Sequence, residues 1–381
     1  MKKIVKTITA YVPGTMCNLR CNYCYISNCA DDPHSRKPTY DYPLETMIKA
    51  FNPKRLGGIA EIHVISGGET LIDDTVVPFI HGLLKYGHVV TVVTNLTLNN
   101  RIDELLDFPK EYLKHLIVKG SLHWLELKRL NKVDDFFNNM NKVLNSGASS
   151  FPFIVMSQDY MPYIDEIERT CKEKLNSMPH CTPSIVFEEK TINGNTTTNP
   201  ECTEEFVNFV NERFDSEIFR ASVKYLNVDI KRIFCYAGEW SFGVNLKTGG
   251  MVKCHNCPEE VNFYKNLNKM PKLLPIGNNC QIANCALQYN FIAEGLIPEG
   301  PITPLFGDML SRPNLINEEV REMLNVRFSD IHKQYSLKKQ KKINRKVALC
   351  FAVPNNSLMD KILYRVWKKL DKILRKKGII K

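Results

Sequence analysis

Short runs of β-forming residues alternate with helix-forming stretches along the first half of the chain. The expected strands are residues 7–12, 61–66, 89–94, 115–121, 151–157 and 184–188, and the expected helices are 44–51, 75–86, 102–106, 133–145 and 163–175. Such alternation is typical of βαβ units, in which helices join parallel strands and cover the sheet. It limits this half of the chain to an α/β fold.

Six β/α units within about 190 residues are too few for a closed barrel of eight. They predict a partial (β/α)6 TIM-like barrel, and a doubly wound sheet fits less well. After the barrel (1–190) we expect a linker and bridging helix (191–225), a small cysteine-rich domain (226–311) and a basic helical tail (312–381). In either α/β fold, functional groups lie on loops after the carboxyl ends of the strands.

The basic residues are concentrated at one end of the chain. The 381 residues carry a formal net charge of +10, but the segment 331–381 alone holds 16 Lys or Arg and two acidic residues, a net charge of +14. The remainder carries 35 basic and 39 acidic residues, a net charge of −4. Because the body is mildly acidic, the overall charge does not indicate a body that binds nucleic acid.

The sequence contains no apolar run of the roughly 18 residues that a membrane-spanning helix needs. Lys6 also interrupts any signal-peptide core near the start. We therefore expect a cytoplasmic protein. In a reducing compartment its 13 cysteines indicate metal or redox chemistry and not disulfides.

Three cysteines follow the first expected strand in a C-x3-C-x2-C arrangement. They are Cys17, Cys21 and Cys24, with Tyr23 directly before the third. Three thiolates on one short loop can hold three irons of a 4Fe–4S cube and leave the fourth iron open. Zinc is the alternative, because Cys29 is close enough in sequence to complete a site of four thiolates.

This loop resembles the signature of the radical S-adenosylmethionine (SAM) superfamily, C-x3-C-x-aromatic-C after the first barrel strand. A second match ends the next expected strand, where Gly67-Gly68-Glu69-Thr70 is similar to the family's Gly-Gly-Glu-Pro, with Thr70 in place of proline. Glycines let the backbone approach a ligand closely, and a carboxylate can accept hydrogen bonds from an ammonium group. The resemblance implies that Gly67, Gly68 and Glu69 bind the amino group of SAM.

Two weaker resemblances lie at the ends of later strands. In related enzymes polar groups there contact the methionine carboxylate or the ribose of SAM, which implies such a role for Asn95 and Ser121. His123 is a candidate acid or base, but a single histidine beside Trp124 is more often a packed residue.

Five more cysteines lie in the region 226–311. The spacing of Cys235, Gly249 and Cys254 resembles the opening of the SPASM and twitch extensions that follow many radical SAM barrels, and a turn at 247–250 predicts a hairpin. The complete SPASM pattern is absent, so the resemblance implies a twitch-like domain with one auxiliary 4Fe–4S cluster. Its expected ligands are Cys235, Cys254, Cys280 and Cys285, with Cys257 as a substitute for Cys280 and zinc as the alternative metal. The isolated cysteines are expected to be structural: Cys171, Cys181, Cys202 and Cys350.

The resemblance also implies a reaction. A cluster with an open iron, reduced by a partner such as flavodoxin or ferredoxin, cleaves SAM to methionine and a 5′-deoxyadenosyl radical, which abstracts a hydrogen atom from the substrate. An auxiliary cluster could accept the second electron of a net oxidation. Glu239 and Tyr236, beside Cys235, are the nearest candidates for a proton acceptor, although a salt bridge or packing would also explain them.

Two substrate classes remain open. A small polar molecule, such as a sugar, a cyclitol or a lipid-linked form, is favoured, because the cysteine loop starts at residue 17 and leaves no room before the barrel for a peptide-binding domain. The alternative is a peptide maturase that oxidises or cross-links a side chain. A zinc-stabilised protein that binds RNA or membrane is the contrasting class, and it would leave the Gly-Gly-Glu segment unexplained.

Residues 358–377 have the pattern of an amphipathic helix, with an apolar stripe and a basic remainder. Such a helix could lie on the anionic inner face of a membrane, bind RNA phosphates, or pack its stripe on the barrel while its lysines remain solvated. The last interpretation is favoured.

Overall fold

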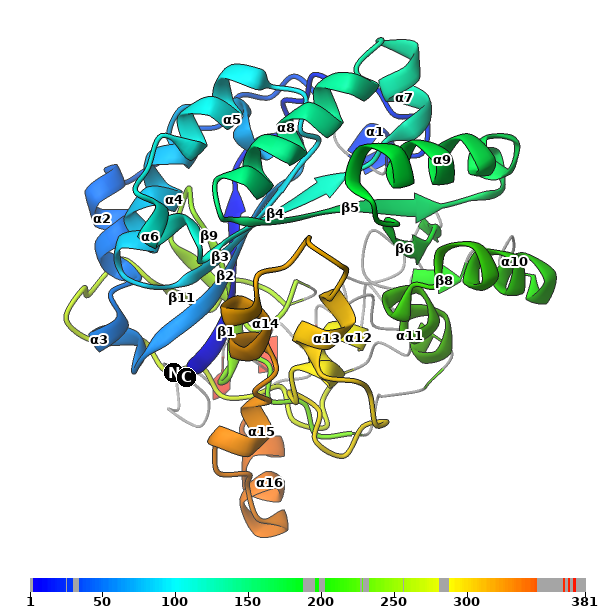
Figure 1. Cartoon of the computed structure of the whole chain (residues 1–381). Coiled ribbons are helices and arrows are strands. Elements are labelled where there is room, and N and C mark those ends of the chain that lie inside the picture. The colour runs from blue at the N-terminus through cyan, green and yellow to red at the C-terminus, as the bar shows by residue number, and fades with distance from the viewer. Residues whose placement is uncertain are drawn as a thin grey trace.

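The computed structural model describes residues 3–24, 26–29, 34–187, 196–198, 203–226, 228, 233–255, 257–280 and 288–347, with five positions between 366 and 374. Its main feature is a nine-stranded sheet in the order β11-β10-β9-β1-β2-β3-β4-β5-β6 (Figure 1). The first six strands are parallel neighbours in chain order: β1 (Ile4–Val12), β2 (Ile59–Ser66), β3 (Val89–Thr94), β4 (Leu116–Ser121), β5 (Ser149–Met156) and β6 (His180–Pro183). The predicted partial (β/α)6 barrel is confirmed.

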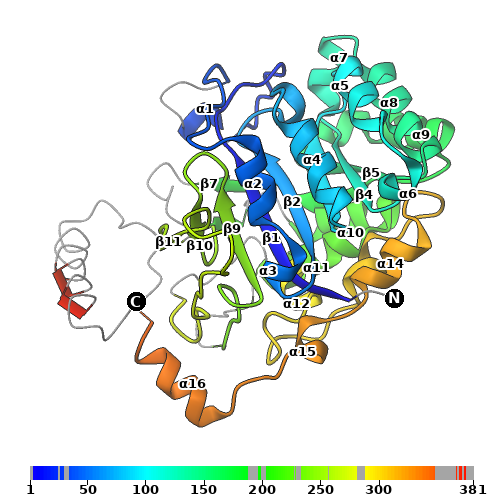
Figure 2. The ribbon, with the colours of Figure 1, turned by 90° about the vertical axis from the view of Figure 1, so that its left-hand side faces the viewer.

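Helices cover the outer face of these strands (Figures 1 and 2). Those between β1 and β6 are α1 (Ile26–Cys29), α2 (Leu44–Ala50), α3 (Pro53–Leu56), α4 (Val76–Lys85), α5 (Asn99–Leu106), α6 (Lys110–Leu113), α7 (Trp124–Arg129), α8 (Val133–Asn145) and α9 (Ile164–Leu175), with short 3-10 turns η1 (Thr70–Ile72) and η2 (Gln158–Tyr163). Ala60, Ile62 and Val64 of β2 are fully buried in the core under these helices. Because side chains alternate along a strand, Glu61 and His63 point the other way, into the barrel.

The sixth strand differs from the prediction. The expected strand at 184–188 contains β7 (Ile185–Phe187), which pairs with β8 (Thr196–Thr198) in a separate two-stranded sheet. The barrel instead ends in β6, which has Pro183 as its last residue. Proline argues against a strand inside a sheet but is tolerated on an edge strand, and this hides β6 from sequence patterns.

Three strands from the cysteine-rich region extend the sheet beyond β1. β9 (Ser241–Asn245) runs parallel to β1, while β10 (Gly250–Val252) and β11 (Val261–Asn262) continue antiparallel. The predicted hairpin is confirmed, with Gly249 in its turn at φ +72°, a conformation that favours glycine. The sheet therefore joins the cysteine-rich region to the barrel.

The carboxyl-terminal segment closes the amino-terminal end of the barrel. Ile4, Ile59, Val89, Ile117 and Phe151 lie near the starts of five strands and share one hydrophobic cluster with residues of the helices that follow. The remaining helices are α10 (Glu204–Phe214), α11 (Glu217–Leu226), α12 (Gln288–Ala293), α13 (Phe306–Leu310), α14 (Glu318–Leu324), α15 (Phe328–Ile331) and α16 (Leu337–Asn344). Residues from 312 onward, expected to begin a tail, are thus packed into the body as far as α16.

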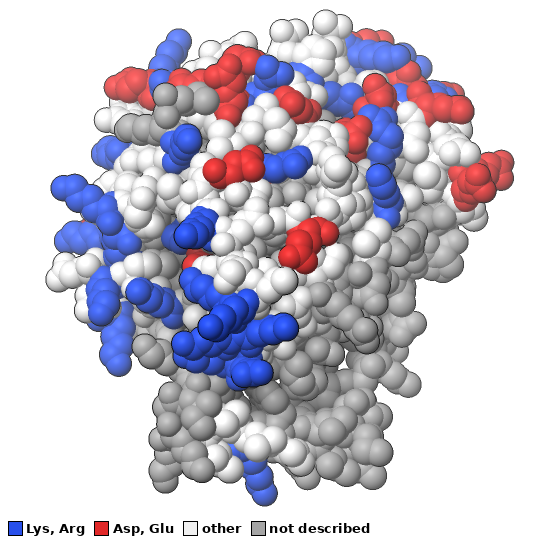
Figure 3. All heavy atoms as spheres, turned by 90° about the horizontal axis from the view of Figure 1, so that it is seen from below, with Lys and Arg blue, Asp and Glu red and all other residues white. Residues whose placement is uncertain are grey.

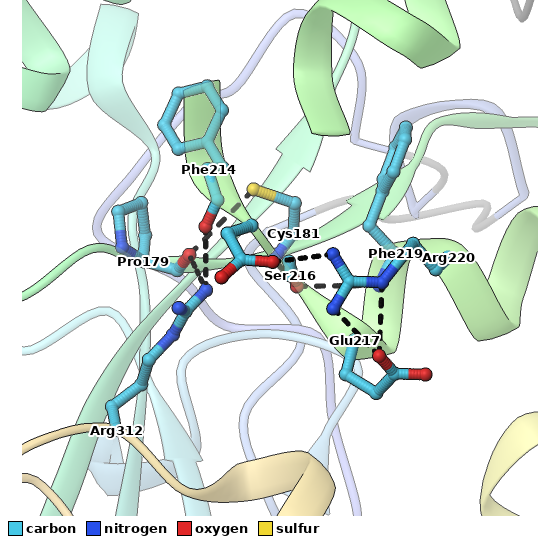
Figure 4. A network of polar contacts seen from close by, with 9 residues as sticks. Pro179, Cys181, Phe214, Ser216, Glu217, Phe219, Arg220 and Arg312 are labelled. Carbon is cyan, nitrogen blue, oxygen red and sulfur yellow. Dashed lines mark hydrogen bonds and ion pairs between the residues drawn. The ribbon is translucent and has the colours of Figure 1, made fainter. Parts of the chain in front are cut away.

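Arg312 fixes this segment to the edge of the barrel (Figure 4). Its Nη2 donates to the carbonyl oxygens of Phe214 at 2.8 Å and Pro179 at 3.4 Å. The backbone N–H of Cys181 in β6 donates to Ser216 Oγ at 3.1 Å. These contacts join β6, the α10–α11 junction and the start of the carboxyl-terminal segment.

Basic side chains gather on the face seen from below (Figure 3). α16, the lowest helix in Figure 1, carries exposed lysines, and the expected helix at 358–377 lies largely outside the described residues. Of its apolar stripe, Val366, Leu370 and Ile373 are 49%, 51% and 49% exposed, and the expected packing of the stripe on the barrel stays a prediction. Within the described part of the chain, no helix is both long and apolar enough to cross a bilayer.

Candidate functional site

The three cysteines of the C-x3-C-x2-C motif lie on the loop after β1, at the carboxyl end of the barrel. Burial, together with neighbouring thiols of the motif, raises the pKa of the Cys17 thiol to about 11 and that of the Cys21 thiol to about 12. The backbone N–H of Leu19 donates to Cys17 Sγ at 3.4 Å. Three half-buried sulfurs at such close range fit an iron–sulfur cluster held by three thiolates.

The end of β2 packs directly on this loop. At Gly68, a Cβ atom would lie 2.0 Å from the carbonyl oxygen of Met16, so no side chain fits there. The backbone N–H of Glu69 donates to the same oxygen at 2.8 Å. This contact brings the Gly-Gly-Glu segment beside Cys17, where the Glu69 charge also raises the pKa of the thiol.

The carboxylate of Glu69 is buried and accepts three hydrogen bonds. Its Oε1 accepts from the backbone N–H of Leu71 at 2.9 Å and from Thr94 Oγ1 at 2.6 Å, and its Oε2 accepts from the backbone N–H of Asn95 at 2.8 Å. The side chain thus ties the end of β2 to the end of β3. Burial raises its pKa. These three hydrogen bonds account for a buried carboxylate at this position without a bound ligand.

Asn95 holds the cysteine loop from the end of β3. Its Nδ2 donates to Asn18 Oδ1 at 2.8 Å, and its Oδ1 accepts from the backbone N–H and the hydroxyl of Thr97 at 3.1 and 2.6 Å. Asn18, next to Cys17, donates in turn to Thr97 Oγ1 at 2.7 Å. Asn95 therefore positions the loop, and its expected contact with SAM stays a prediction.

The aromatic residue of the motif joins the loop to β4 and η2. Tyr23 OH lies 2.6 Å from His123 Nδ1, and Tyr160 OH donates to Tyr23 OH at 3.1 Å. Burial lowers the pKa of His123 to about 4, so its ring is neutral at pH 7. His123 is thus a packed residue that supports the loop. Ser121 is half-buried at the end of β4.

Glu126 is a support that the sequence analysis missed. Its Oε1 accepts from the backbone N–H of Arg20, in the cysteine loop, at 2.7 Å. Arg129, three residues later on α7, donates to both of its oxygens at 2.7 and 2.8 Å and lowers its pKa. The spacing of Glu126 and Arg129 indicates an ion pair on a helix, but no local pattern indicates the contact with the loop.

The second group of cysteines lies at the opposite end of the barrel. Cys235 precedes β9 and Cys254 follows β10, so both are just outside the hairpin strands and not on them. Burial raises the pKa of Cys235, and the thiols of Cys254 and Cys280 raise it further, which places the three together. Cys257 is disulfide-bonded, which corrects the expectation that the cysteines form no disulfides, and Cys285 lies outside the described residues. At about 3.3 Å per residue along β1, the two cysteine groups are on the order of 20 Å apart.

Tyr236 and Glu239 lie in a packed cluster away from the cysteine loop. Tyr335 OH donates to the carboxylate oxygens of Glu239 at 2.5 and 2.7 Å, and Tyr236 OH accepts from the backbone N–H of Tyr335 at 2.7 Å. Tyr236 also stacks on Trp240, with ring centroids 3.7 Å apart. Lys6, near the start of β1, donates to the carbonyl oxygen of Glu239 at 2.7 Å. Packing and hydrogen bonding therefore account for both residues.

A polar cluster inside the barrel was also missed. Glu61 Oε1 and His63 Nε2 lie 2.9 Å apart, and a carboxylate oxygen of Glu294 is within 4.8 Å of both residues' ligand atoms. The alternation of β2 could have placed Glu61 and His63 on one face. Glu294 follows α12, far along the chain, and no local pattern connects it with β2.

A comparison with protein families agrees with this geometry. Residues 11–155 match the Radical SAM superfamily. The matched span contains the three-cysteine loop, the Gly-Gly-Glu segment and the ends of β1 to β4, which are the parts that form the site. Residues 11–155 of the chain are therefore similar to the radical SAM superfamily.

Individual relatives are more distant. The 7-carboxy-7-deazaguanine synthase of Rhodopirellula baltica is 26% identical over 170 residues, which are 44% of this chain and 62% of that protein. Streptococcus suis SuiB bound to SAM is 14% identical over 70% of this chain and 65% of its own, with a TM-score of 0.47, and a further SuiB structure is bound to the precursor peptide SuiA. The structure of anSMEcpe with bound SAM is 15% identical over 69% and 76% of the two chains, with a TM-score of 0.45. The chain thus spans less than two thirds of the length of the first two relatives.

Proposed function

We propose that the protein cleaves SAM reductively and uses the radical to abstract a hydrogen atom from a small polar substrate inside the barrel. The observation that carries this proposal is the attachment of the three-cysteine loop to the ends of β2, β3 and β4. Separate polar contacts through Met16, Asn18, Arg20 and Tyr23 hold the loop at the mouth of the barrel. A reactive centre there faces whatever the barrel contains.

Cys17, Cys21 and Cys24 are the proposed ligands of a 4Fe–4S cluster. When bound, such a cluster supplies the electron that cleaves SAM into methionine and the 5′-deoxyadenosyl radical. The chain itself orients the reactants and limits the access of water. The backbone of the Gly-Gly-Glu segment and Ser121 are the proposed SAM contacts, and Asn95 contributes by positioning the loop.

The inward-facing side chains of the strands support a polar substrate. Four inward-facing side chains of β1 to β4 are half-buried, whereas their outward-facing neighbours are buried: these are Thr9, His63, Val93 and Lys119. Such a difference is expected where the interior of a barrel is open. Lys119 Nζ lies 3.4 Å from the centre of the Phe153 ring, and burial lowers its pKa to about 8. Hydroxyl and imidazole groups with a lysine suit a hydroxylated or anionic molecule.

We also propose that Cys235, Cys254, Cys280 and Cys285 hold an auxiliary cluster. The thiols of Cys254 and Cys280 raise the pKa of the Cys235 thiol, and all three residues pack against the hydrophobic cluster that closes the barrel. Cys257 could replace one of them only after its disulfide is reduced. A substrate in the barrel interior would lie between the two groups of cysteines, which suits the removal of a second electron.

Iron and sulfide per chain, measured after anaerobic reconstitution, test both cluster assignments. We expect about eight irons in the native protein and about four in the C17A/C21A/C24A variant. C171A, which removes a buried thiol of α9, is the control and should keep the native count. About four irons falling to none would remove the auxiliary cluster, and no iron in either protein would overturn the proposal.

Deuterium transfer into 5′-deoxyadenosine tests the substrate class. The reduced protein is incubated with SAM and either deuterated monosaccharides and cyclitols or deuterated peptides. Transfer from a small hydroxylated molecule is the expected result. Transfer from a peptide alone would replace the proposed substrate by that of a peptide maturase.

A further inference from the structure

Three ionisable side chains meet inside the barrel, apart from both groups of cysteines. Glu61 and His63 lie two residues apart on β2 and on its inward face. Glu294 directly follows α12, in the segment that closes the amino-terminal end of the barrel. One ligand atom of each residue lies within 4.8 Å of the other two. Two carboxylates and one imidazole from distant parts of the chain thus converge on one point.

The cluster contains an unsatisfied acceptor. Glu294 is only 5% exposed, and its Oε2 has no hydrogen-bond partner among the described residues. A buried polar atom without a partner costs roughly 1–3 kcal/mol, and more if it is charged. Native proteins therefore seldom leave one without a partner, an ordered water or an ion.

The charge of the cluster is also unbalanced. Glu61 is 2% exposed and forms an ion pair with His63. Among the described residues, Glu294 forms no ion pair, and Glu61 forms no second one. A bound cation would remove both the charge imbalance and the missing partner.

We infer that Glu61, His63 and Glu294 bind one divalent metal ion of the class of Mn²⁺, Fe²⁺ or Zn²⁺. Carboxylate and imidazole ligands together suit these ions. Ligands about 2.1 Å from an ion lie roughly 3.0 to 4.2 Å apart, so a contraction of about half an ångström brings the three atoms into range.

Three protein ligands leave coordination positions open. The His63 side chain is 20% exposed while that of Glu61 is 2% exposed, so the open side of the cluster is the one beside His63. An oxygen atom of a substrate in the barrel interior could complete the coordination there. The ion would then select for substrates that carry a hydroxyl or carboxylate group.

Binding of Mn²⁺ to the full-length, anaerobically reconstituted protein tests this inference. Mn²⁺ favours carboxylate over thiolate, so the cysteines compete weakly for it. Free Mn²⁺ is counted by electron paramagnetic resonance without SAM or reductant, which separates the result from the proposed radical chemistry. We expect one ion per chain in the native protein, and at least about tenfold weaker binding in E294Q and H63Q.

E319Q is the matched control. Glu319 forms a Glu–His pair on the surface, with Oε1 3.3 Å from His115 Nε2, and Lys114 Nζ already balances its charge at 2.9 Å. This variant should bind Mn²⁺ like the native protein. Mn²⁺ should raise the thermal midpoint of the native and E319Q proteins but not that of E294Q. Equal affinity in folded E294Q and native protein would overturn the inference, as would an absence of binding to the native protein; if E294Q does not fold, H63Q carries the comparison.

Discussion

Replacing Gly68 by alanine tests whether the cysteine loop depends on its contact with the end of β2. The new Cβ would lie 2.0 Å from the carbonyl oxygen of Met16 and 2.6 Å from that of Thr15, whereas real Cβ atoms stay beyond 3.0 Å. Both oxygens belong to the backbone, so no rotamer change relieves the clash, and the loop must move by about 1 Å. Overpacking of this kind costs about 1–3 kcal/mol. Loss of the hydrogen bond from Glu69 N–H to Met16 O adds about 1 kcal/mol.

The expected loss is therefore about 2–4 kcal/mol in the free energy of unfolding, together with weaker retention of iron by the cysteine loop. Urea denaturation measures the first, and iron per chain after desalting measures the second. G67A is the matched control, because its Cβ would meet its nearest atoms at 3.3 Å and the neighbours need to yield only slightly. If G68A kept the stability and iron content of the native protein, the contact would not be what holds the loop.

Three further predictions concern the supports of the loop and the buried histidines. E69Q should lower the free energy of unfolding by about 2 kcal/mol in urea, because an amide cannot accept all three hydrogen bonds made to the carboxylate. Y23F should lose about 1–2 kcal/mol and more iron than Y160F, because it removes the central hydroxyl between His123 and Tyr160, and equal iron loss in the two variants would contradict this role. Acid should destabilise the protein below pH 6.5, because burial lowers the pKa of His88 and His123 to about 4 in the folded protein. Their contribution to the free energy of unfolding is complete above about pH 6.5, the pKa of histidine in the unfolded chain, and is lost as the pH falls toward 4. The loss at pH 5 should be about 2 kcal/mol for each histidine. A free energy of unfolding that stays constant from pH 7 to pH 5 would refute this last expectation.

The barrel could be predicted because its strands are long, apolar and separated by periodic helices. β3 and α8 begin and end at the predicted residues. β6 could not be found, since its four residues end in proline and only its place at the edge of the sheet allows this. The attachment of β9 to β1 also escaped prediction, because pairing between strands so far apart in sequence leaves no local pattern.

The site shows the same division. Its cysteines and glycines were predicted from two short motifs, and the structure brings these two motifs into contact. Their supports could not, since Arg20 and Glu126 are 106 residues apart in sequence, and Tyr23 and Tyr160 are 137 apart. Asn95 was found by its place at a strand end, but whether such a side chain faces a ligand or the loop is decided by tertiary contacts.

The pairing of β9 with β1 has a mechanical consequence. Residues 7–11 of β1 pair with residues 241–245 of β9, and β1 leads directly into the three-cysteine loop. The cysteine-rich region therefore cannot swing away on a hinge, because the strand to which it is bonded is also the stem of the loop. The distance between the two groups of cysteines is set by the length of one strand. A molecule that contacts both groups must therefore span a distance on the order of 20 Å.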